Sequence, residues 1–260
     1  MSDLRRLYQS YLEFAMETAH RAGRLTLGYF QTGTAAEYKS DDTPVTAADK
    51  SAEKLIRQRI ESAYPDHAIV GEEYGTSANS RDDIRWIVDP IDGTKSFVHG
   101  VPLFGVLLAL EIEGRVEVGV VYFPALDEMV AAATGLGCWF NGRRVGVSPV
   151  NRLDRAVVSC TDAGSFDACG RGGAWRRIQQ ATYFRAGWGD AYGHCLVATG
   201  RVELMLDPVM SVWDCAPFPP ILKEAGGYFG DWQGNPTIYA EEAISTTPVL
   251  LPQVLELIKT

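Results

Sequence analysis

The sequence predicts an α/β protein in which two helices precede a mostly antiparallel sheet, and a second α/β half follows. Three observations support this. Apolar residues recur at helical spacing over residues 4–29, apolar and β-branched runs dominate the middle of the chain, and mixed patterns return after a break at residues 148–154. We therefore expect an N-terminal half at residues 1–150 and a C-terminal half at residues 151–260.

Two helices are predicted at the start of the chain. Residues 4–29 place apolar side chains at steps of three and four, which is typical of a long amphipathic helix. The second helix follows the polar segment "YKSDDTPVT" and ends by Pro65. Thr46 and Asp49 fit the capping pattern of a helix start, and a capping residue can also face a site.

Strands are predicted through the middle of the chain. The runs "AIVGEE" and "RWIVD" are short, apolar and end in acidic residues, so we expect buried strands there. Residues 104–124 read as a hairpin, and Asn141-Gly142 is a strong tight-turn signal. After the break we expect a strand in "AVVSCTD", a glycine-rich loop at residues 167–175 and a closing helix at residues 252–260.

Composition limits the partners. The formal net charge is −9, which argues against nucleic acid or an anionic membrane, because both need a basic surface. An anionic substrate would then have to be attracted by bound metal. The five cysteines show no CxxC pair, the N-terminus has no signal-peptide pattern, and no apolar run approaches the roughly 20 residues of a membrane span. We expect a soluble, cytoplasmic protein.

The stretch "WIVDPIDGTKSF" at residues 86–97 is the strongest functional signal. It sets Asp89 and Asp92 three residues apart at the end of an apolar run. Two like charges this close repel unless a cation lies between them or one of them is protonated. The stretch is therefore either an acidic turn or a cation site, and Gly93-Thr94 suits a turn that presents backbone N–H groups to an anion.

Other carboxylates strengthen the second interpretation. Glu72 and Asp214 also follow apolar stretches, although alone they would read as a solvated residue past a strand and as a helix N-cap. Converging carboxylates without histidine or cysteine favour Mg²⁺ or Mn²⁺ over Zn²⁺. The spacing of Asp89 and Asp92 differs from the Asp-x-Asp nucleophile of haloacid-dehalogenase-type phosphatases, so a covalent aspartyl-phosphate is not indicated.

"GEE", "WIVDPIDGT", "SF", "GVPLFG" and "VWDCA", in this order, resemble the inositol monophosphatase superfamily of Mg²⁺-dependent phosphatases. The resemblance runs from about Thr46 to Gly227. It implies a five-layer αβαβα sandwich of the inositol monophosphatase and fructose-1,6-bisphosphatase type. It also implies a homodimer, with an active site between the two halves of each chain.

The resemblance also implies roles for individual residues. Glu72, Asp89 and the Ile91 carbonyl would bind a first Mg²⁺, and Asp89 would bridge to a second, shared with Asp92 and Asp214. Glu72 would help to hold a weaker third ion. The N–H groups of Gly93 and Thr94 would hold the phosphate, while Thr94, oriented by Asp49, would position the attacking water.

Within the superfamily, "KSF", "GVPLFGVLLALE" and "GWGDAYGHCLVATGRVELMLDPVMSVWD" are most similar to the histidinol-phosphatase branch, which serves histidine biosynthesis. Asp190 would suit a substrate that carries an amine and an imidazole. Asp207 would contact the organic part of the substrate, or is a turn residue before Pro208. Arg185 would contact substrate, pair with Asp190, or simply lie on the surface.

Two alternatives remain open. One is the same chemistry on inositol 1-phosphate or another sugar or nucleotide phosphate. The other is a non-catalytic regulator that binds metal or phosphate, which the intact set of carboxylates argues against. Pro217 and Pro219 depart from the family pattern, and we expect the helix after Asp214 to begin late or to bend.

Overall fold

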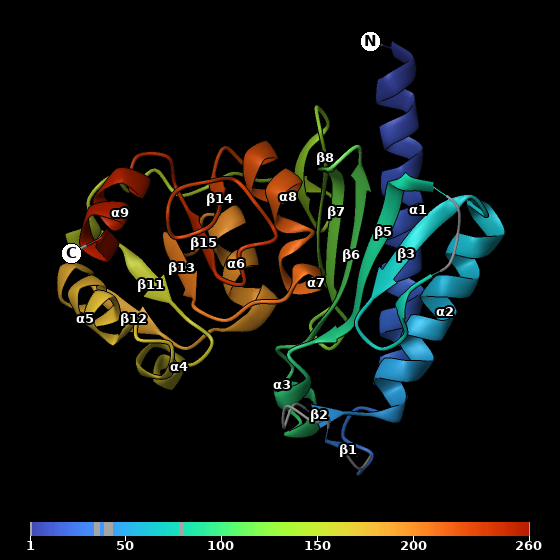
Figure 1. Cartoon of the computed structure of the whole chain (residues 1–260), viewed down its shortest axis with the longest axis horizontal. Coiled ribbons are helices and arrows are strands. Elements are labelled where there is room, and N and C mark those ends of the chain that lie inside the picture. The colour runs from blue at the N-terminus through green and yellow to red at the C-terminus, as the bar shows by residue number, and fades with distance from the viewer. Residues whose placement is uncertain (1, 34–36, 39–43, 78–80, 260) are drawn as a thin grey trace.

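The computed structural model describes residues 2–33, 37–38, 44–77 and 81–259. Figure 1 shows a layered α/β molecule in which the N-terminal and C-terminal parts of the chain each form a sheet. In the described residues the larger sheet has eight strands and the second has five, and a two-stranded ribbon lies apart from both. The ribbon consists of β1 (Glu37–Tyr38) and β2 (Pro44–Val45).

The larger sheet is antiparallel except for the parallel pair β3 and β5, as the alternation and hairpin signals predict. Its strands follow the spatial order β10-β9-β8-β7-β6-β5-β3-β4. Their bounds are β3 His67–Gly71, β4 Gly75–Thr76, β5 Arg81–Asp92, β6 Gly105–Ile112, β7 Arg115–Phe123, β8 Glu128–Ala133, β9 Gly137–Phe140 and β10 Arg143–Arg144. The turns at Glu113-Gly114 and Asn141-Gly142 have positive φ angles at both residues, as tight hairpin turns require.

The second sheet follows the order β12-β11-β13-β15-β14 and mixes parallel and antiparallel pairs. Its strands are β11 Val157–Ser159, β12 Phe184–Ala186, β13 Leu204–Asp207, β14 Tyr228–Gly230 and β15 Ala243–Thr246. The helices, including one 3₁₀ turn, are α1 Ser2–Leu27, α2 Ala47–Ala63, α3 Thr94–Val98, η1 Leu153–Arg155, α4 Ala163–Ala168, α5 Gly172–Ala181, α6 Asp190–Ala198, α7 Val212–Cys215, α8 Phe218–Glu224 and α9 Leu251–Lys259.

Three apolar clusters stack these elements into five layers. Side chains of α1 and α2, among them Ala15 and Ile56, pack on one face of the larger sheet. Helices α6 and α8 lie between the two sheets, where Cys195 and Phe218 join the same core as Leu107 of β6. Helices α4, α5 and α9 cover the far face of the second sheet. The predicted αβαβα sandwich is therefore confirmed.

Local sequence signals account for most helix boundaries. Thr46 is the N-cap of α2 and forms a capping box with Asp49, as the pattern predicts. Pro217 ends the short helix α7 and caps α8, whose first turn contains Pro219, so the predicted late start after Asp214 is confirmed. No helix in the described ranges is both long and apolar enough to cross a membrane.

One local prediction was wrong. Residues 167–175 are not a single glycine-rich loop, because α4 ends at Ala168 and α5 already begins at Gly172. Trp175 stacks on Phe166 with 4.5 Å between ring centroids, and Ile178 is fully buried. Burial of this apolar face stabilises a helix that two glycines would disfavour on their own.

Candidate active site

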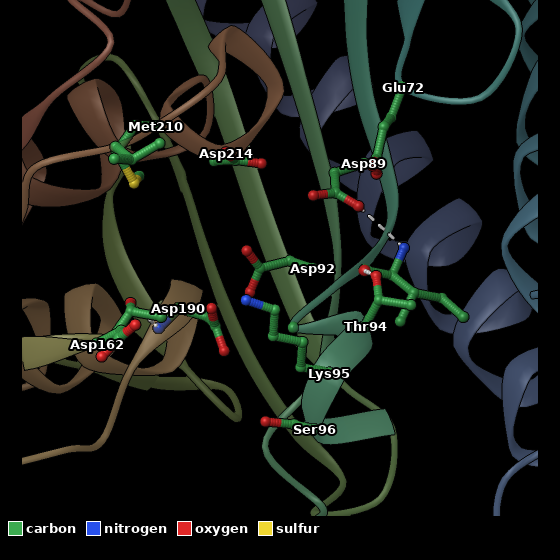
Figure 2. A pocket seen from close by; sticks show the side chains of 14 residues that line it. Glu72, Asp89, Asp92, Thr94, Lys95, Ser96, Asp162, Asp190, Met210 and Asp214 are labelled. Atoms are coloured by element: carbon green, nitrogen blue, oxygen red, sulfur yellow. Dashed lines mark hydrogen bonds between the residues drawn. The ribbon is translucent and has the colours of Figure 1, made fainter. Parts of the chain in front are cut away.

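A cavity of about 400 Å³ opens where the ends of β5 and α3 meet the second half of the chain. Among the described residues its lining carries six carboxylates and a single cationic side chain, Lys95. The carboxylates are Glu72, Asp89, Asp92, Asp162, Asp190 and Asp214. Figure 2 shows Glu72, Asp89, Asp92 and Lys95 on one side and Asp162 and Asp190 on the other. The cavity combines residues that are far apart in the sequence.

The end of β5 positions the central pair of carboxylates. The pairing of β5 with β6 becomes irregular between Asp89 and Asp92, at Pro90, which has no N–H to donate. Asp89 Oδ1 accepts a hydrogen bond from the backbone N–H of Ile91 at 3.0 Å (Figure 2). Both carboxylates are almost fully buried, with exposed fractions of 2% and 7%.

Asp214 comes from the other half of the chain. It is the third residue of α7 and its Oδ2 accepts the N–H of Ser211 at 2.7 Å, so Ser211 rather than Asp214 is the N-cap. One oxygen each of Asp89, Asp92 and Asp214 lies within 4.8 Å of the others. The predicted convergence of these three carboxylates is therefore present in the structure.

Burial makes the ionised form of this cluster unfavourable. The pKa of Asp89 is raised well above its ordinary value by burial and by the charges of Glu72, Asp92 and Asp214. Burial likewise raises the pKa of Asp92 strongly, with Asp190 as the next contribution. For Asp214 burial raises the pKa to about 6, although its hydrogen bonds act in the opposite direction. These groups need a compensating positive charge to remain ionised near neutral pH.

Glu72 lies at the start of a turn that a buried glutamate holds. Glu53 of α2 is fully buried and accepts the N–H groups of Glu73 at 2.7 Å and Tyr74 at 3.3 Å. A Cβ on Gly71 would lie 2.0 Å from Glu53 Oε1, so only glycine permits this approach. Glu53 is a supporting residue that the sequence patterns did not reveal.

Gly93, Thr94 and Asp49 lie close to the cluster but differ in their contacts. Gly93 has a φ of +76°, and a Cβ there would lie 2.8 Å from the carbonyl oxygen of Leu103. Thr94 Oγ1 donates to the carbonyl oxygen of Ile91 at 2.9 Å (Figure 2). The hydrogen bond from Thr94 to Asp49 that the resemblance implies is not among the contacts of the described residues, because Thr94 instead reaches the carbonyl three residues back.

Asp49 is absent from the cavity lining and closes the capping box of α2 with Thr46, the N-cap. Its Oδ2 accepts both the backbone N–H of Thr46, at 2.8 Å, and the Thr46 hydroxyl, at 2.5 Å. Its Oδ1 is buried and has no hydrogen-bond partner among the described residues. Burial raises the pKa of Asp49 to about 6, and the charge of Glu72 adds to the rise.

The three predicted substrate residues have different positions. Asp190 lines the cavity, and Figure 2 shows its carboxylate across from Lys95. Asp207 is 2% exposed and is not part of the lining; its Oδ1 accepts the N–H of Thr161 at 3.0 Å. Arg185 is exposed, donates to the carbonyl oxygens of Thr182 and Tyr183, and lines a separate hollow. Neither a cavity position for Arg185 nor an ion pair with Asp190 is present in the described residues.

Sequence patterns missed several lining residues. Lys95, Ser96, Thr161, Asp162 and Met210 all border the cavity. Lys95 and Ser96 directly follow the "DGT" turn, so their position next to the motif was an available signal. The others lie on loops of the second half, and their place in the cavity depends on how the two sheets pack.

The donor set fits hard divalent cations. The three converging groups offer only carboxylate oxygens, which suit Mg²⁺ and similar ions. Their raised pKa values and the unsatisfied Oδ1 of Asp49 show a concentration of negative charge that the described residues themselves do not neutralise. The structure therefore contains a group of carboxylates that could hold metal, without showing which ion.

Comparisons with known proteins are consistent with one another in family and in fold. The sequence profile of the inositol monophosphatase family matches residues 7–259. A histidinol-phosphatase of Chlorobaculum parvum is 44% identical, with 90% of each chain covered, and the Nus factor SuhB of Escherichia coli is 32% identical, with 86% of each covered. The solved structure of an IMPase from Thermotoga maritima has a TM-score of 0.87 at 30% identity, covering 96% of this chain and 97% of that one.

Proposed function

The chain belongs to the inositol monophosphatase family, and from this premise we propose that it is an Mg²⁺-dependent phosphomonoesterase that converts L-histidinol phosphate to L-histidinol in histidine biosynthesis. Phosphatase activity follows from the family. The single observation that carries the metal-dependent chemistry is the convergence of Asp89, Asp92 and Asp214 from both halves of the chain. Two or three ions would bind there, and Mn²⁺ could substitute.

Each residue in the cluster would have a distinct role. Asp89, Asp92 and Asp214 would hold the cations, with help from Glu72 and the Ile91 carbonyl. When bound, these ions would activate a water molecule and offset the charge of the phosphoryl group. The backbone N–H groups of Gly93 and Thr94 would donate to the phosphate oxygens.

Thr94 and Asp49 would orient the water for in-line attack. Rotation about the Cα–Cβ bond of Thr94 would release its hydroxyl from the Ile91 carbonyl and turn it towards the water. The buried Oδ1 of Asp49 is then an available acceptor for a proton. The water oxygen forms the new bond to phosphorus, the ester bond breaks, and the leaving alcohol takes up a proton, so no protein nucleophile is required.

Histidinol phosphate is favoured by charge and by similarity. Asp190 lines the cavity across from Lys95, and its carboxylate would attract the ammonium of an amino alcohol ester. The histidinol-phosphatase at 44% identity supports the same substrate. Inositol 1-phosphate is neutral in its organic part and would form no ion pair with Asp190. It remains the alternative substrate, since the family also contains inositol monophosphatases.

Substrate preference can be measured directly. Phosphate release by the purified protein with Mg²⁺ should be fastest on L-histidinol phosphate in a panel with inositol 1-phosphate, fructose 1,6-bisphosphate and an adenosine bisphosphate. A higher kcat/KM on inositol 1-phosphate would overturn the substrate. Mg²⁺ binding without turnover of any ester would favour a regulator, the class to which the similarity to a Nus factor points.

Three further expectations stay predictions. A homodimer follows only from the resemblance and is tested by sedimentation of the purified protein. Cytoplasmic location is tested by fractionation of cells. We also propose that residues 1–150 and 151–260 are two structural units that share the site, with Asp214 and the substrate-selecting residues supplied by the second.

A further inference from the structure

Asp190 has an unusual backbone conformation. Its φ is +52°, in the left-handed region that residues with a Cβ rarely adopt, and it is the first residue of α6. Such strain persists only where surrounding contacts hold it, and it is common at functional sites. The Asp190 N–H donates a hydrogen bond of 2.7 Å to Thr161 Oγ1, which holds the backbone at this point.

Thr161 is itself held in place by a series of buried side chains. Its N–H donates to Asp207 Oδ1 at 3.0 Å, and the second oxygen of Asp207 lies 3.3 Å from His194 Nε2. His194 is fully buried, and its Nδ1 lies 2.7 Å from Ser245 Oγ. The backbone also fixes Thr161 closely, since a Cβ on Gly189 would lie 2.5 Å from the Thr161 Cα. Thr161 therefore has little freedom to move away from Asp190.

The strained turn aims two groups at the first half of the chain. The N–H of Ala191 donates to Asp92 Oδ2 at 2.8 Å. The Oδ2 of Asp190 lies 3.2 Å from the place where a Cβ on Gly93 would be. The carboxylate proposed to select the substrate and the donor to a proposed metal ligand thus belong to adjacent residues, and Thr161 contacts the first of them.

We infer that Thr161 is a positioning residue that fixes the direction of the Asp190 carboxylate in the cavity. This inference rests on the proposed function, because it gives Asp190 its role in holding the substrate ammonium. It also assigns Asp207 an indirect part: Asp207 holds Thr161, and Thr161 holds the turn. A different role, in which the Thr161 hydroxyl touches substrate directly, makes different predictions.

A double-mutant cycle separates the two roles. The variants are Thr161→Val, which removes the hydroxyl at nearly constant shape, Thr161→Ser, which keeps it, Asp190→Asn, and Thr161→Val combined with Asp190→Asn. Thr161 is exposed, so the fold should tolerate each change, and Thr161→Ala provides a second test of the lost hydroxyl. Kinetics use L-histidinol phosphate and p-nitrophenyl phosphate, which has no amine.

We expect Thr161→Val to raise KM for L-histidinol phosphate about tenfold and to change kcat/KM for p-nitrophenyl phosphate by less than about threefold. Thr161→Ser should stay within about threefold of the wild type on both esters. In the Asp190→Asn background, Thr161→Val should have no further effect. An equal loss on both esters would mean that Thr161 acts through the Ala191–Asp92 contact instead of through Asp190, and an undiminished effect in that background would indicate direct contact with substrate. Either result would overturn the inference.

A second readout needs neither metal nor turnover. In the metal-free protein, hydrogen exchange of the Asp190 amide should accelerate in Thr161→Val and not in Thr161→Ser. Unchanged exchange in Thr161→Val would count against a positioning role. If the wild type fails to prefer L-histidinol phosphate, the proposed function fails instead. The amide exchange and the cycle on the best ester of the panel then still decide the role of Thr161.

Discussion

The backbone N–H of Ala191 donates to Asp92 Oδ2 at 2.8 Å, across 99 positions of sequence. Asp92 ends β5 of the first sheet and Ala191 lies in the first turn of α6, which packs between the two sheets. A proposed metal ligand of one half is therefore oriented by the backbone of the other. The site therefore depends on the docking of both halves.

Asp89→Asn should reduce kcat/KM at least about 100-fold, because even residues that merely support metal ligands change affinity or activity by roughly 10–100-fold. Phosphate release and Mg²⁺ titration by calorimetry measure this loss. In the absence of metal the variant should unfold at or above the wild-type temperature, since a neutral amide avoids the cost of burying a carboxyl group whose pKa is raised. A folded Asp89→Asn protein with wild-type turnover would contradict the metal assignment.

Without divalent cations the protein should lose stability as pH rises from about 4 to about 7. The pKa values of Asp49 and Asp214 are raised to about 6 and that of Asp190 to about 7, above the value near 4 of an unfolded aspartate. The folded state therefore binds more protons than the unfolded state in this window, so the free energy of unfolding decreases with pH. Calorimetry in a chelator measures the slope.

Added Mg²⁺ should reverse that trend, since it binds the ionised carboxylates of the folded protein. The gain in unfolding temperature on adding Mg²⁺ should be small near pH 5 and larger near pH 7. A gain that does not depend on pH would mean that the ions bind elsewhere than at the buried cluster.

Gly93→Ala should lower both stability and activity. Its φ of +76° penalises an L residue by about 1–2 kcal/mol, and the new Cβ would lie 2.8 Å from the Leu103 carbonyl oxygen. Gly142→Ala is the matched control, because its φ is +75° and nothing lies within 4 Å of a Cβ there. We expect comparable backbone strain in the control with unchanged kcat/KM. Equal activities for the two variants would remove Gly93 from the phosphate site.

Asp190→Asn should raise KM for L-histidinol phosphate roughly tenfold or more, since a charge-assisted contact with the ammonium is lost. Hydrolysis of inositol 1-phosphate should stay within about threefold. Asp162→Asn serves as the control, because Asp162 lines the same cavity and an asparagine can still cap α4. If both variants have the same effect, the overall negative charge of the cavity lining, and not Asp190 specifically, selects the substrate.

The sequence predicted the parts of the site that lie within one continuous stretch. Asp89, Asp92, Gly93 and Thr94 follow one buried strand, so their proximity needs only the local geometry of a strand end and a turn. Asp214 could be added because the order and spacing of whole motifs resemble a family. The αβαβα layer order was likewise implied by that resemblance, whereas helical and strand periodicities predicted only the order of helices and strands along the chain.

Contacts between segments that are distant in the sequence could not be predicted from local patterns. The positions of Thr161 and Glu53 follow from hydrogen bonds across 29 and 20 residues, which no local pattern encodes. Asp207 ends a buried strand and Glu72 directly follows one, yet Asp207 is buried beneath Thr161, whose N–H it accepts, and is absent from the lining. Arg185 lies on the edge strand β12, where its guanidinium bonds to nearby carbonyls instead of reaching Asp190.

Glu53→Gln should destabilise the protein by about 3–5 kcal/mol, the usual effect of breaking a buried ion pair. Glu53 is fully buried, pairs with Arg57 at 2.7 Å, and accepts the N–H groups that shape the turn after Glu72. The neutral amide leaves Arg57 without its counter-charge. Chemical denaturation measures the change, and Glu17→Gln, which breaks an exposed pair with Arg21, should have no measurable effect.

The Glu53→Gln variant also tests whether the turn that begins at Glu72 contributes to the proposed metal site. If Glu53 holds Glu72 in place for cation binding, Glu53→Gln should also weaken Mg²⁺ binding below its unfolding temperature, although Glu53 itself does not line the cavity. The link is mechanical: the Glu73 N–H loses its anionic acceptor, so the preceding carboxylate is no longer fixed relative to Asp89. Unaltered Mg²⁺ affinity in a destabilised variant would confine Glu53 to folding and remove Glu72 from the set of residues that control the metal.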